Sequence, residues 1–153
     1  MQHTDRLRES LPDSAKDTRL NLAAVLGDGG ALNSAQRWGA ALAVALAAKN
    51  APLAQAFAAD ARAENGEALI EDAHAAATLM AMNNVYYRFR HRVENAAYAH
   101  KPARLRMTRL AQPATNKLDF ELFALAVSAF NDCEFCVRAH ERAVRDGGLT
   151  EEH

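Results

Sequence analysis

The sequence predicts an all-α fold, and three observations support this prediction. Hydrophobic residues make up 50% of the 153 residues, and alanine, which loses no side-chain entropy when it enters a helix, supplies a large part of them. No segment alternates polar and apolar residues with the β-branched content of a strand. Helix start and stop signals recur along the chain at helix-length spacing. The length is that of a single domain over residues 1–153.

Four helices are predicted in the first 90 residues. A cap signal at Pro12 to Ser14 marks the start of the first helix, Asn33 or Ser34 caps the second, and Gly66 ends the third. An Asn-Asn pair at 83–84 inside the fourth predicts specific hydrogen bonds, because amides are unusual in a helix interior. The predicted helices cover 10–27, 33–50, 51–66 and 67–90.

A basic segment follows these helices. Between Arg88 and Arg109 the chain carries seven arginines or lysines and a single acidic residue, Glu94. The whole chain has a formal charge of −1, which does not favour nucleic-acid binding. We therefore expect a solvated or subunit-facing loop in this segment.

Two further helices are predicted near the end of the chain. Residues 118–131 are apolar nearly all round, as in a helix that is buried on most sides. Asn131 or Asp132 can cap a second helix over 133–146, which Gly147 and Gly148 end.

The last third resembles an earlier part of the chain at an offset of 83 residues. The tripeptide Leu-Ala-Val at 42–44 recurs at 125–127, and the predicted repeats cover about 33–82 and about 116–153. At this offset Trp38, Asn50, Leu53 and Phe57 are the inert counterparts of Glu121, Cys133, Cys136 and His140. The first copy continues into a helix after Gly66, so the repeat predicts that a corresponding final helix is missing after the second.

Four residues of the second copy form a candidate redox site. Cys133, Cys136 and His140 share one helix face, because they recur at steps of three and four. A helix start favours a thiolate at Cys133, and Cys136 has His140 one turn away as a base. Glu121 is the candidate partner of His140, because a buried carboxylate without a partner is costly. This contact requires the two helices to fold back antiparallel.

Two other interpretations of the C-x-x-C spacing stay open. A zinc site uses the same spacing, but tetrahedral zinc takes four ligands and only His140 lies nearby in the sequence. A metal-binding module would therefore need a fourth ligand from a neighbouring subunit. Alternatively, Cys133 and Cys136 pack as small hydrophobic side chains without any chemistry.

The composition also predicts where the protein works. With 18 basic and 19 acidic residues, nothing suggests a membrane-surface partner. The first residues are polar and no apolar run reaches bilayer-spanning length, so we expect a cytoplasmic protein without a signal peptide or a membrane helix. In a reducing compartment a close cysteine pair is more often catalytic or metal-binding than structural.

The chain resembles the alkyl hydroperoxide reductase D (AhpD) family, within the carboxymuconolactone decarboxylase-like superfamily. The resemblance extends from "LPDSAKDTRLNL" through "QRWGAALAVALAAKN" and "MAMNNVYYRFR" to "FELFALAVSAFNDCEFCVRAHE". The last stretch is the most specific: a glutamate, eleven residues, C-x-x-C, three residues and a histidine. Glu121, Cys133, Cys136 and His140 occupy these places without a gap.

The resemblance implies an AhpD-like helical fold and a homotrimeric antioxidant enzyme with no bound cofactor. Its activities would be those of a peroxidase and a disulfide reductase. Cys136 would form the sulfenic acid intermediate with the hydroperoxide, and Cys133 would donate a proton and then close the redox disulfide. Glu121 and His140 would relay protons.

The resemblance also implies partners. The disulfide would be reduced by lipoyl groups of a dihydrolipoamide acyltransferase, which dihydrolipoamide dehydrogenase and NADH keep reduced. A further implied role is to return reducing equivalents to a partner peroxiredoxin, AhpC. The nearest alternative is a dithiol/disulfide oxidoreductase with weak peroxidase activity.

Two features depart from the family pattern. Family members carry a further histidine immediately before the second cysteine, where this chain has Phe135. That loss of a proton-handling group affects the peroxidase reaction more than dithiol exchange. Family members also continue beyond the position of His153 with an alanine-rich helix, the element that the internal repeat predicts to be missing.

Overall fold

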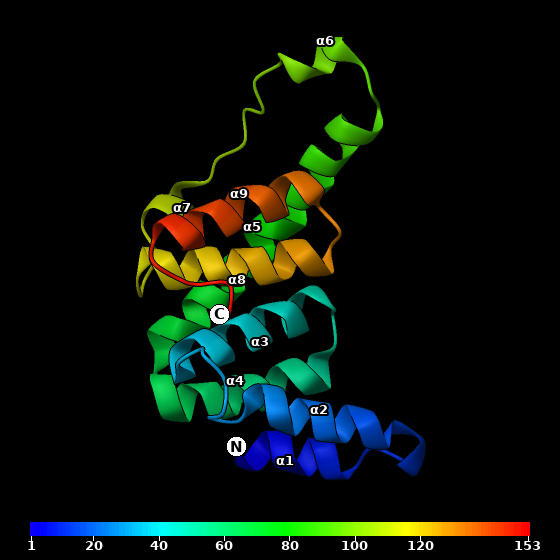
Figure 1. The fold of residues 1–153 in the computed structure, drawn as a ribbon, viewed down its shortest axis with the longest axis vertical. Coiled ribbons are helices and arrows are strands. Elements are labelled where there is room, and N and C mark those ends of the chain that lie inside the picture. Colours follow the sequence, from blue (N-terminus) through cyan, green and yellow to red (C-terminus); the bar gives the residue numbers. More distant parts are fainter.

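The protein is built from helices that stack along one long axis (Figure 1). The computed structural model describes the backbone of residues 1–153 and every side chain except that of Ala99. No strand occurs in this described part, so the all-α prediction is confirmed. In chain order the elements are α1 (Gln2–Glu9), η1 (Asp13–Ala15), α2 (Lys16–Leu26), α3 (Ser34–Ala47), α4 (Ala51–Asn65), α5 (Glu67–Arg92), α6 (Ala96–Ala99), α7 (Thr108–Ala111), α8 (Lys117–Phe130) and α9 (Glu134–Asp146).

Most predicted helices have their expected positions, but the N-terminal region differs. Helix α1 lies in a segment for which the sequence predicted no element. The predicted start at Pro12 to Ser14 forms only the short helix η1, and α2 begins at Lys16 without a side-chain cap. Asn33 rather than Ser34 caps α3, in a capping box with Gln36. Gly66 ends α4 as expected, with a left-handed φ of 82°.

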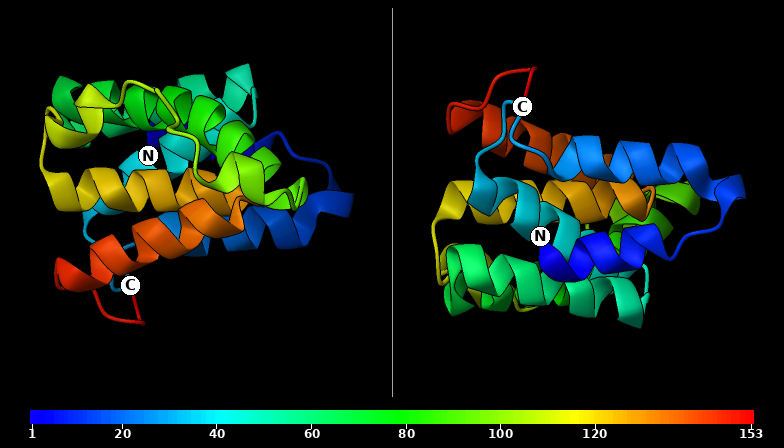
Figure 2. Two further views of the ribbon diagram at one scale, coloured as in Figure 1. Left: turned by 90° about the horizontal axis from the view of Figure 1, so that it is seen from above. Right: turned by 90° about the horizontal axis from the view of Figure 1, so that it is seen from below.

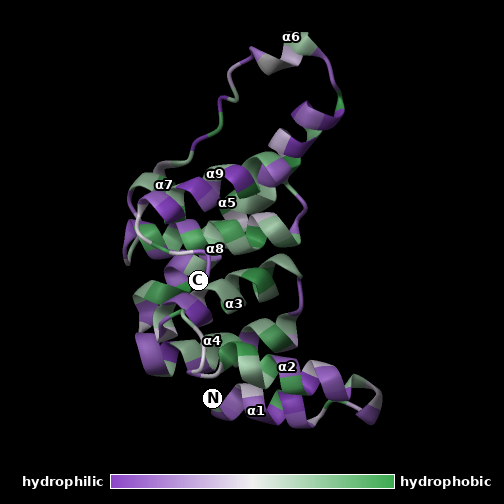
Figure 3. Ribbon diagram, viewed as in Figure 1, coloured by the Kyte–Doolittle hydropathy of each residue, from purple (hydrophilic) through white to green (hydrophobic). Residues whose placement is uncertain are grey.

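Helices α3 and α8 lie side by side at the centre and run in the same direction (Figure 1). Gln36 of α3 donates through Nε2 to Asp119 Oδ1 of α8 at 2.9 Å. Further along both helices, Gly39 faces the fully buried ring of Phe123, where a Cβ would lie 2.0 Å from Cζ. Only a glycine allows the two helices to approach this closely. Green, hydrophobic shades accordingly follow α3 and α8 in Figure 3.

Helix α5 packs against both central helices and then continues into an arm. Its Asp72, which is fully buried, accepts hydrogen bonds from the backbone N–H groups of Ala114 and Thr115 at 2.8 and 2.7 Å. These bonds fix the loop that leads into α8. The far end of α5 and α6 project from the body, and the chain returns to α7 as an extended segment (Figure 1). The side chains of 91–98, within the predicted basic loop, are exposed.

The opposite end of the molecule is formed by α1 and α2 (Figure 2). Asp60 of α4 is buried and accepts hydrogen bonds from the backbone N–H groups of His3 and Thr4, at 3.1 and 2.7 Å. One carboxylate therefore holds the first turn of α1 against α4.

The backbone repeats at the offset of 83 residues that the sequence suggested. Helices α3 and α8 have matching bounds, and asparagine caps both of them, Asn33 and Asn116. The turns that follow also match, because Lys49 and Asp132 both have a φ of 55°. The geometry is thus repeated, and its origin by duplication stays a prediction.

An apolar groove of about 500 Å³ lies between α2, α3, α4 and the end of α8. Its lining includes Leu32, Ala45 and Ala48. The residues 83 positions later, Thr115, Ser128 and Asn131, each form a hydrogen bond with a side chain of α5. A counterpart of α5 at this offset would begin at Thr150, because α5 begins at Glu67. Residues 150–153 form a turn. The missing final helix stays a prediction.

Candidate active site

The turn between α8 and α9 places the two cysteines. Asn131 ends α8, Asp132 adopts the left-handed conformation, and Cys133 is the N-cap residue of α9. The backbone N–H of Cys133 donates to Ser128 O at 3.1 Å. The prediction that Asn131 or Asp132 caps α9 is therefore wrong, because Asn131 completes the preceding helix. Gly147 ends α9 as predicted, with Gly148 at a φ of 104°.

Cys133 and Cys136 form a disulfide, with their Cα atoms 5.3 Å apart. Their exposed fractions are 0% and 4%, so a reactant reaches the sulfur atoms only if the side chains around them move. His140 and Val144 continue the buried stripe of α9, while Glu134 is exposed. The predicted single face for the cysteines and the histidine is thus present.

Glu121 and His140 meet across the α8–α9 hairpin. The Oε2 atom of Glu121 lies 2.6 Å from Nδ1 of His140, and both side chains are buried. With Glu121 ionised, Nδ1 carries the proton and Nε2 is left as the acceptor nitrogen. The antiparallel arrangement that the sequence required is present, and it provides a buried base one helical turn after Cys136.

The first repeat carries an aromatic pair at the same positions. Trp38 and Phe57, 83 residues before Glu121 and His140, pack edge to face with ring centroids 5.9 Å apart. The same helix geometry therefore supports hydrophobic packing in one half of the molecule and an acid–imidazole pair in the other.

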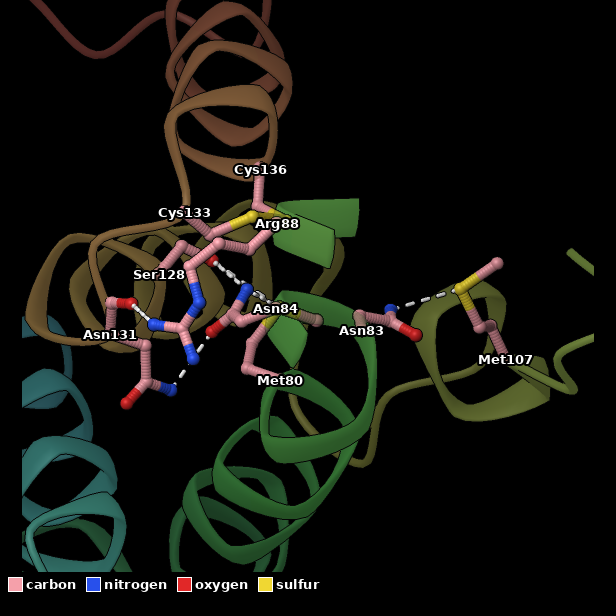
Figure 4. Close-up of a disulfide and its surroundings, with 9 residues drawn as sticks. All are labelled: Met80, Asn83, Asn84, Arg88, Met107, Ser128, Asn131, Cys133 and Cys136. Atoms are coloured by element: carbon pink, nitrogen blue, oxygen red, sulfur yellow. Dashed lines mark hydrogen bonds between the residues drawn. A yellow bond between two sulfur atoms is a disulfide. The ribbon is translucent and has the colours of Figure 1, made fainter. Parts of the chain in front are cut away.

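A polar cluster from α5 supports the turn before the cysteines (Figure 4). Asn84 donates to Ser128 Oγ at 3.0 Å and accepts from Asn131 Nδ2 at 2.9 Å. Arg88 donates through Nη1 to the backbone oxygen of Asn131. The hydrogen bonds predicted for the Asn-Asn pair are confirmed, since Asn83 also bonds to Met107 Sδ.

Sequence analysis missed Arg88 as a residue of this region. It was counted only as one of seven basic residues between Arg88 and Arg109, although the predicted helix 67–90 contains it, and it lies in the last turns of α5. Its spacing of four from Asn84, which places both on one helix face, is the signal that could have identified it.

Phe135 points away from the buried stripe of α9. It is 56% exposed and stacks on Tyr87 of α5, with ring centroids 4.7 Å apart and an interplanar angle of 19°. These two rings, with Arg90 and His91, line a shallow cleft of about 270 Å³ at the start of α9. The residue that replaces the expected family histidine thus forms part of the surface next to the disulfide.

The described residues contain no group of three or more His, Cys, Asp or Glu side chains arranged to hold a metal ion. None of the described helices combines the length and the apolar content that a bilayer crossing requires.

Comparisons with known proteins identify relatives of this chain. Residues 96–153, which include the disulfide and its neighbours, match the model of the carboxymuconolactone decarboxylase family. The chain is 62% identical to alkyl hydroperoxide reductase AhpD of Anaeromyxobacter sp. (strain K) over 152 residues, which cover 99% of this chain and 81% of that protein. It is 49% identical to the protein of the same name from Methylobacterium sp. (strain 4-46), over 97% of this chain and 84% of that protein.

Identity at this level over nearly the whole chain is well above what is needed to establish a family. The shared region contains the C-x-x-C pair, the acid–imidazole pair and all the helices around them. The chain therefore belongs to the AhpD family.

Proposed function

We propose that this protein is an antioxidant alkyl hydroperoxide reductase that uses Cys133 and Cys136 as its redox dithiol. The observation that carries this proposal is the joint placement of the Cys133–Cys136 disulfide and the buried Glu121–His140 pair on one helical hairpin. The printed names of the relatives, alkyl hydroperoxide reductases, support the substrate class.

In the proposed peroxidase step, Cys136 is the attacking residue. His140 Nε2 takes the proton of the Cys136 thiol, and the thiolate attacks the terminal oxygen of the hydroperoxide. The O–O bond breaks, the alkoxide takes the proton from His140 and leaves as an alcohol, and Cys136 becomes a sulfenic acid. Glu121 fixes the imidazole orientation and stabilises its charged form.

In the second step, the sulfur of Cys133 attacks the sulfenic sulfur of Cys136. The S–S bond forms, the S–O bond breaks, and water leaves with the proton that Cys133 gives up. The disulfide of the structure corresponds to the product of this step. Cys133 at the N-cap is the thiol that the helix dipole favours as a thiolate, but only Cys136 stands four residues before His140, which supports its role as the peroxidatic residue.

A dithiol must then reduce the disulfide. We propose lipoyl groups of a dihydrolipoamide acyltransferase as this reductant, with dihydrolipoamide dehydrogenase and NADH behind them, and AhpC as a partner that receives electrons. Two electrons from the reductant dithiol break the S–S bond and return both thiols, while the reductant closes its own disulfide. A homotrimer in the reducing cytoplasm stays part of this proposal.

Two observations favour a second candidate function, a dithiol oxidoreductase with weak peroxidase activity. Phe135 provides no proton-handling group beside the dithiol, and Cys136 is only 4% exposed. A partner dithiol that opens the site on docking would react better than a small hydroperoxide under these conditions.

The deciding experiment is a lipoamide-coupled peroxidase assay on the wild type and the Phe135→His variant. The proposal is supported if the wild type turns over the hydroperoxide and the Cys136→Ser variant does not. Turnover that survives in Cys136→Ser but not in Cys133→Ser would reverse the two cysteine roles. The second function would be favoured if dihydrolipoamide reduces the wild-type disulfide efficiently without peroxide turnover, and if Phe135→His gains that turnover.

A metal measurement covers the remaining interpretation. Reduced wild-type protein is purified without chelator, and its zinc content and melting temperature are measured before and after chelation. About one equivalent of zinc, whose removal also unfolds the protein, would contradict both redox functions and favour a metal-binding module.

A further inference from the structure

We propose that Arg88 is a positioning residue of the dithiol centre, whose guanidinium group holds a positive charge beside Cys133 and Cys136 and so favours the reduced, ionised dithiol over the disulfide. This inference deepens the proposed function, and it rests on that function only in taking the cysteines as redox-active. Figure 4 draws Arg88 of α5 among the residues around the disulfide, with its guanidinium group directed to the backbone oxygen of Asn131 in the turn that precedes α9.

The first argument is the placement of the guanidinium group. Its Nη1 atom donates to the backbone oxygen of Asn131, two residues before Cys133. Asn84, one turn earlier on α5, binds the side chain of the same Asn131 at 2.9 Å. The bond from Nη1 therefore ties the guanidinium group to the turn before the first cysteine, and Asn84 holds the side chain of the same Asn131.

The second argument is that no carboxylate neutralises this charge. Among the described side chains Arg88 forms no ion pair, and its hydrogen-bond acceptor is a neutral carbonyl oxygen. The nearby acids have other partners, since Asp132 pairs with Arg92 at 3.5 Å and Glu134 pairs with Arg138 at 2.5 Å.

The ionisable groups around the dithiol, Arg88 among them, come from three elements. Helix α5 contributes Arg88, Tyr87, Arg90, His91 and Arg92; the turn and α9 contribute Asp132, Glu134, Arg138 and His140; α8 contributes Glu121. Glu121 and His140 bind each other, and His91 lies 3.5 Å from Glu134. Arg90 faces the rings of Tyr86 and Tyr87. Arg88 is thus the cation that bonds directly to the backbone before the cysteines.

The third argument comes from the matching turn in the first repeat. There Lys49 has the same φ of 55° as Asp132, and Asn50 N donates to Ala45 O just as Cys133 N donates to Ser128 O. No arginine among the described side chains bonds to the Ala48 carbonyl oxygen in that turn. The turn therefore forms without a guanidinium group, and the bond from Arg88 is not needed to shape it.

A nearby cation stabilises a thiolate and leaves a disulfide, which is neutral, unaffected. Reduction by a dithiol breaks the S–S bond with two electrons, and the reductant becomes a disulfide. Each protein sulfur atom is then a thiol or a thiolate, and the fraction of thiolate depends on how strongly its surroundings stabilise the negative charge. Arg88 makes the thiolate more favourable, so it shifts this equilibrium towards reduced protein.

The test compares Arg88→Gln with Arg142→Gln, which removes the same charge from an exposed position on α9. The rate of alkylation of the reduced protein is measured from pH 5 to 10, and the disulfide is equilibrated with dihydrolipoamide. We expect Arg88→Gln to slow alkylation at pH 7 by roughly threefold to tenfold and to move the profile to higher pH. The equilibrium constant for reduction should fall by a similar factor, where tenfold corresponds to about 30 mV.

Arg88→Lys, which keeps the charge, should retain most of the wild-type alkylation rate, and Arg142→Gln should match the wild type. Equal profiles for Arg88→Gln and Arg142→Gln would overturn the inference, and so would a lower melting temperature for Arg88→Gln with an unchanged pH profile. If Arg88→Gln does not fold, Arg88→Met takes its place. Alkylation needs no hydroperoxide, so a wild type without peroxidase turnover would count against the proposed function and leave this result intact.

Discussion

The carboxylate of Glu121 lies 2.6 Å from the Nδ1 atom of His140, and both groups are buried between the two last helices. An imidazole held in this way has a fixed tautomer and a defined free nitrogen. The pair occupies the positions where the first repeat carries Trp38 and Phe57. Two matched positions thus hold an acid–imidazole pair in one half of the molecule and an aromatic pair in the other.

Glu121→Gln should lower peroxidase turnover by about tenfold to a thousandfold, because a positioned general base contributes about 10²- to 10⁴-fold and the amide keeps part of the positioning. The measurement is kcat/KM for an alkyl hydroperoxide as a function of pH. Glu141→Gln, an exposed change on α9, is the control and should be neutral. Wild-type kinetics in Glu121→Gln would contradict the proton relay.

Asp72→Asn should destabilise the protein by about 2–4 kcal/mol, because the buried carboxylate accepts charge-assisted bonds from two backbone amides and a hydroxyl. For a chain of this length the melting temperature should fall by roughly 4–15 °C. The matched control is Glu71→Gln, since Glu71 is exposed and pairs at 3.3 Å with Arg109, which also pairs with Asp72 at 3.1 Å. Equal melting temperatures for the two variants would show that Asp72 does not hold the loop before α8.

Gly39→Ala should cost about 1–3 kcal/mol, because the added methyl group would lie 2.0 Å from the Phe123 ring and force α3 and α8 apart. Thermal unfolding measures the loss. Gly30→Ala adds a methyl group where no atom lies within 4 Å, and it should leave the melting temperature almost unchanged. Phe123→Leu in the Gly39→Ala background should recover part of the lost stability if this contact is the cause.

The attachment of α1 should depend on pH through Asp60. Burial raises the pKa of Asp60, but the hydrogen bonds from Thr4 and His3 and the charge of the N-terminus outweigh it, so the pKa lies below 3.8. The stabilisation is therefore present above pH 3.8 and is lost as the pH falls through the lower, folded-state pKa. Hydrogen exchange of the Thr4 amide should be slow at pH 7 and lose its protection in acid.

Asp60→Asn should remove this protection already at pH 7, and the difference between variant and wild type should shrink below pH 3.8. Glu9→Gln, an exposed change on α1 itself, is the control. A Thr4 amide that exchanges equally slowly in Asp60→Asn would mean that packing alone holds α1.

Sequence patterns located most of the fold because local signals agree with the tertiary structure. Asn33 starts α3 through its side-chain cap and Gly66 ends α4 with a positive φ, and both signals lie within the local sequence. Helix α1 was missed because its stability comes from Asp60, some fifty residues away, and no local pattern contains that contact. The cap of α9 was wrong because Asn131 serves α8 instead, a choice that only the turn geometry decides.

The candidate site was partly visible in the sequence for a similar reason. Cys133, Cys136 and His140 lie on one helix, so their spacing alone places them together. Glu121 could be found because it is a charge in an apolar helix. Arg88 and Tyr87 reach the site from a third helix, and their distance from the cysteines depends on how α5 crosses the hairpin.

The N-cap position of Cys133 makes stability and reactivity compete at one residue. In the first repeat Asn50 caps α4 by accepting from Leu53 N at 3.1 Å, whereas Cys133 gives α9 no such bond. An asparagine cap is worth about 1 kcal/mol, so α9 begins with a deficit of that order relative to its counterpart. The disulfide offsets this deficit because it ties Cys133 to the first turn of α9, and reduction removes that tie. The reduced protein should therefore have a looser first turn, which would expose Cys136 in the oxidation state that attacks the hydroperoxide in the proposed function.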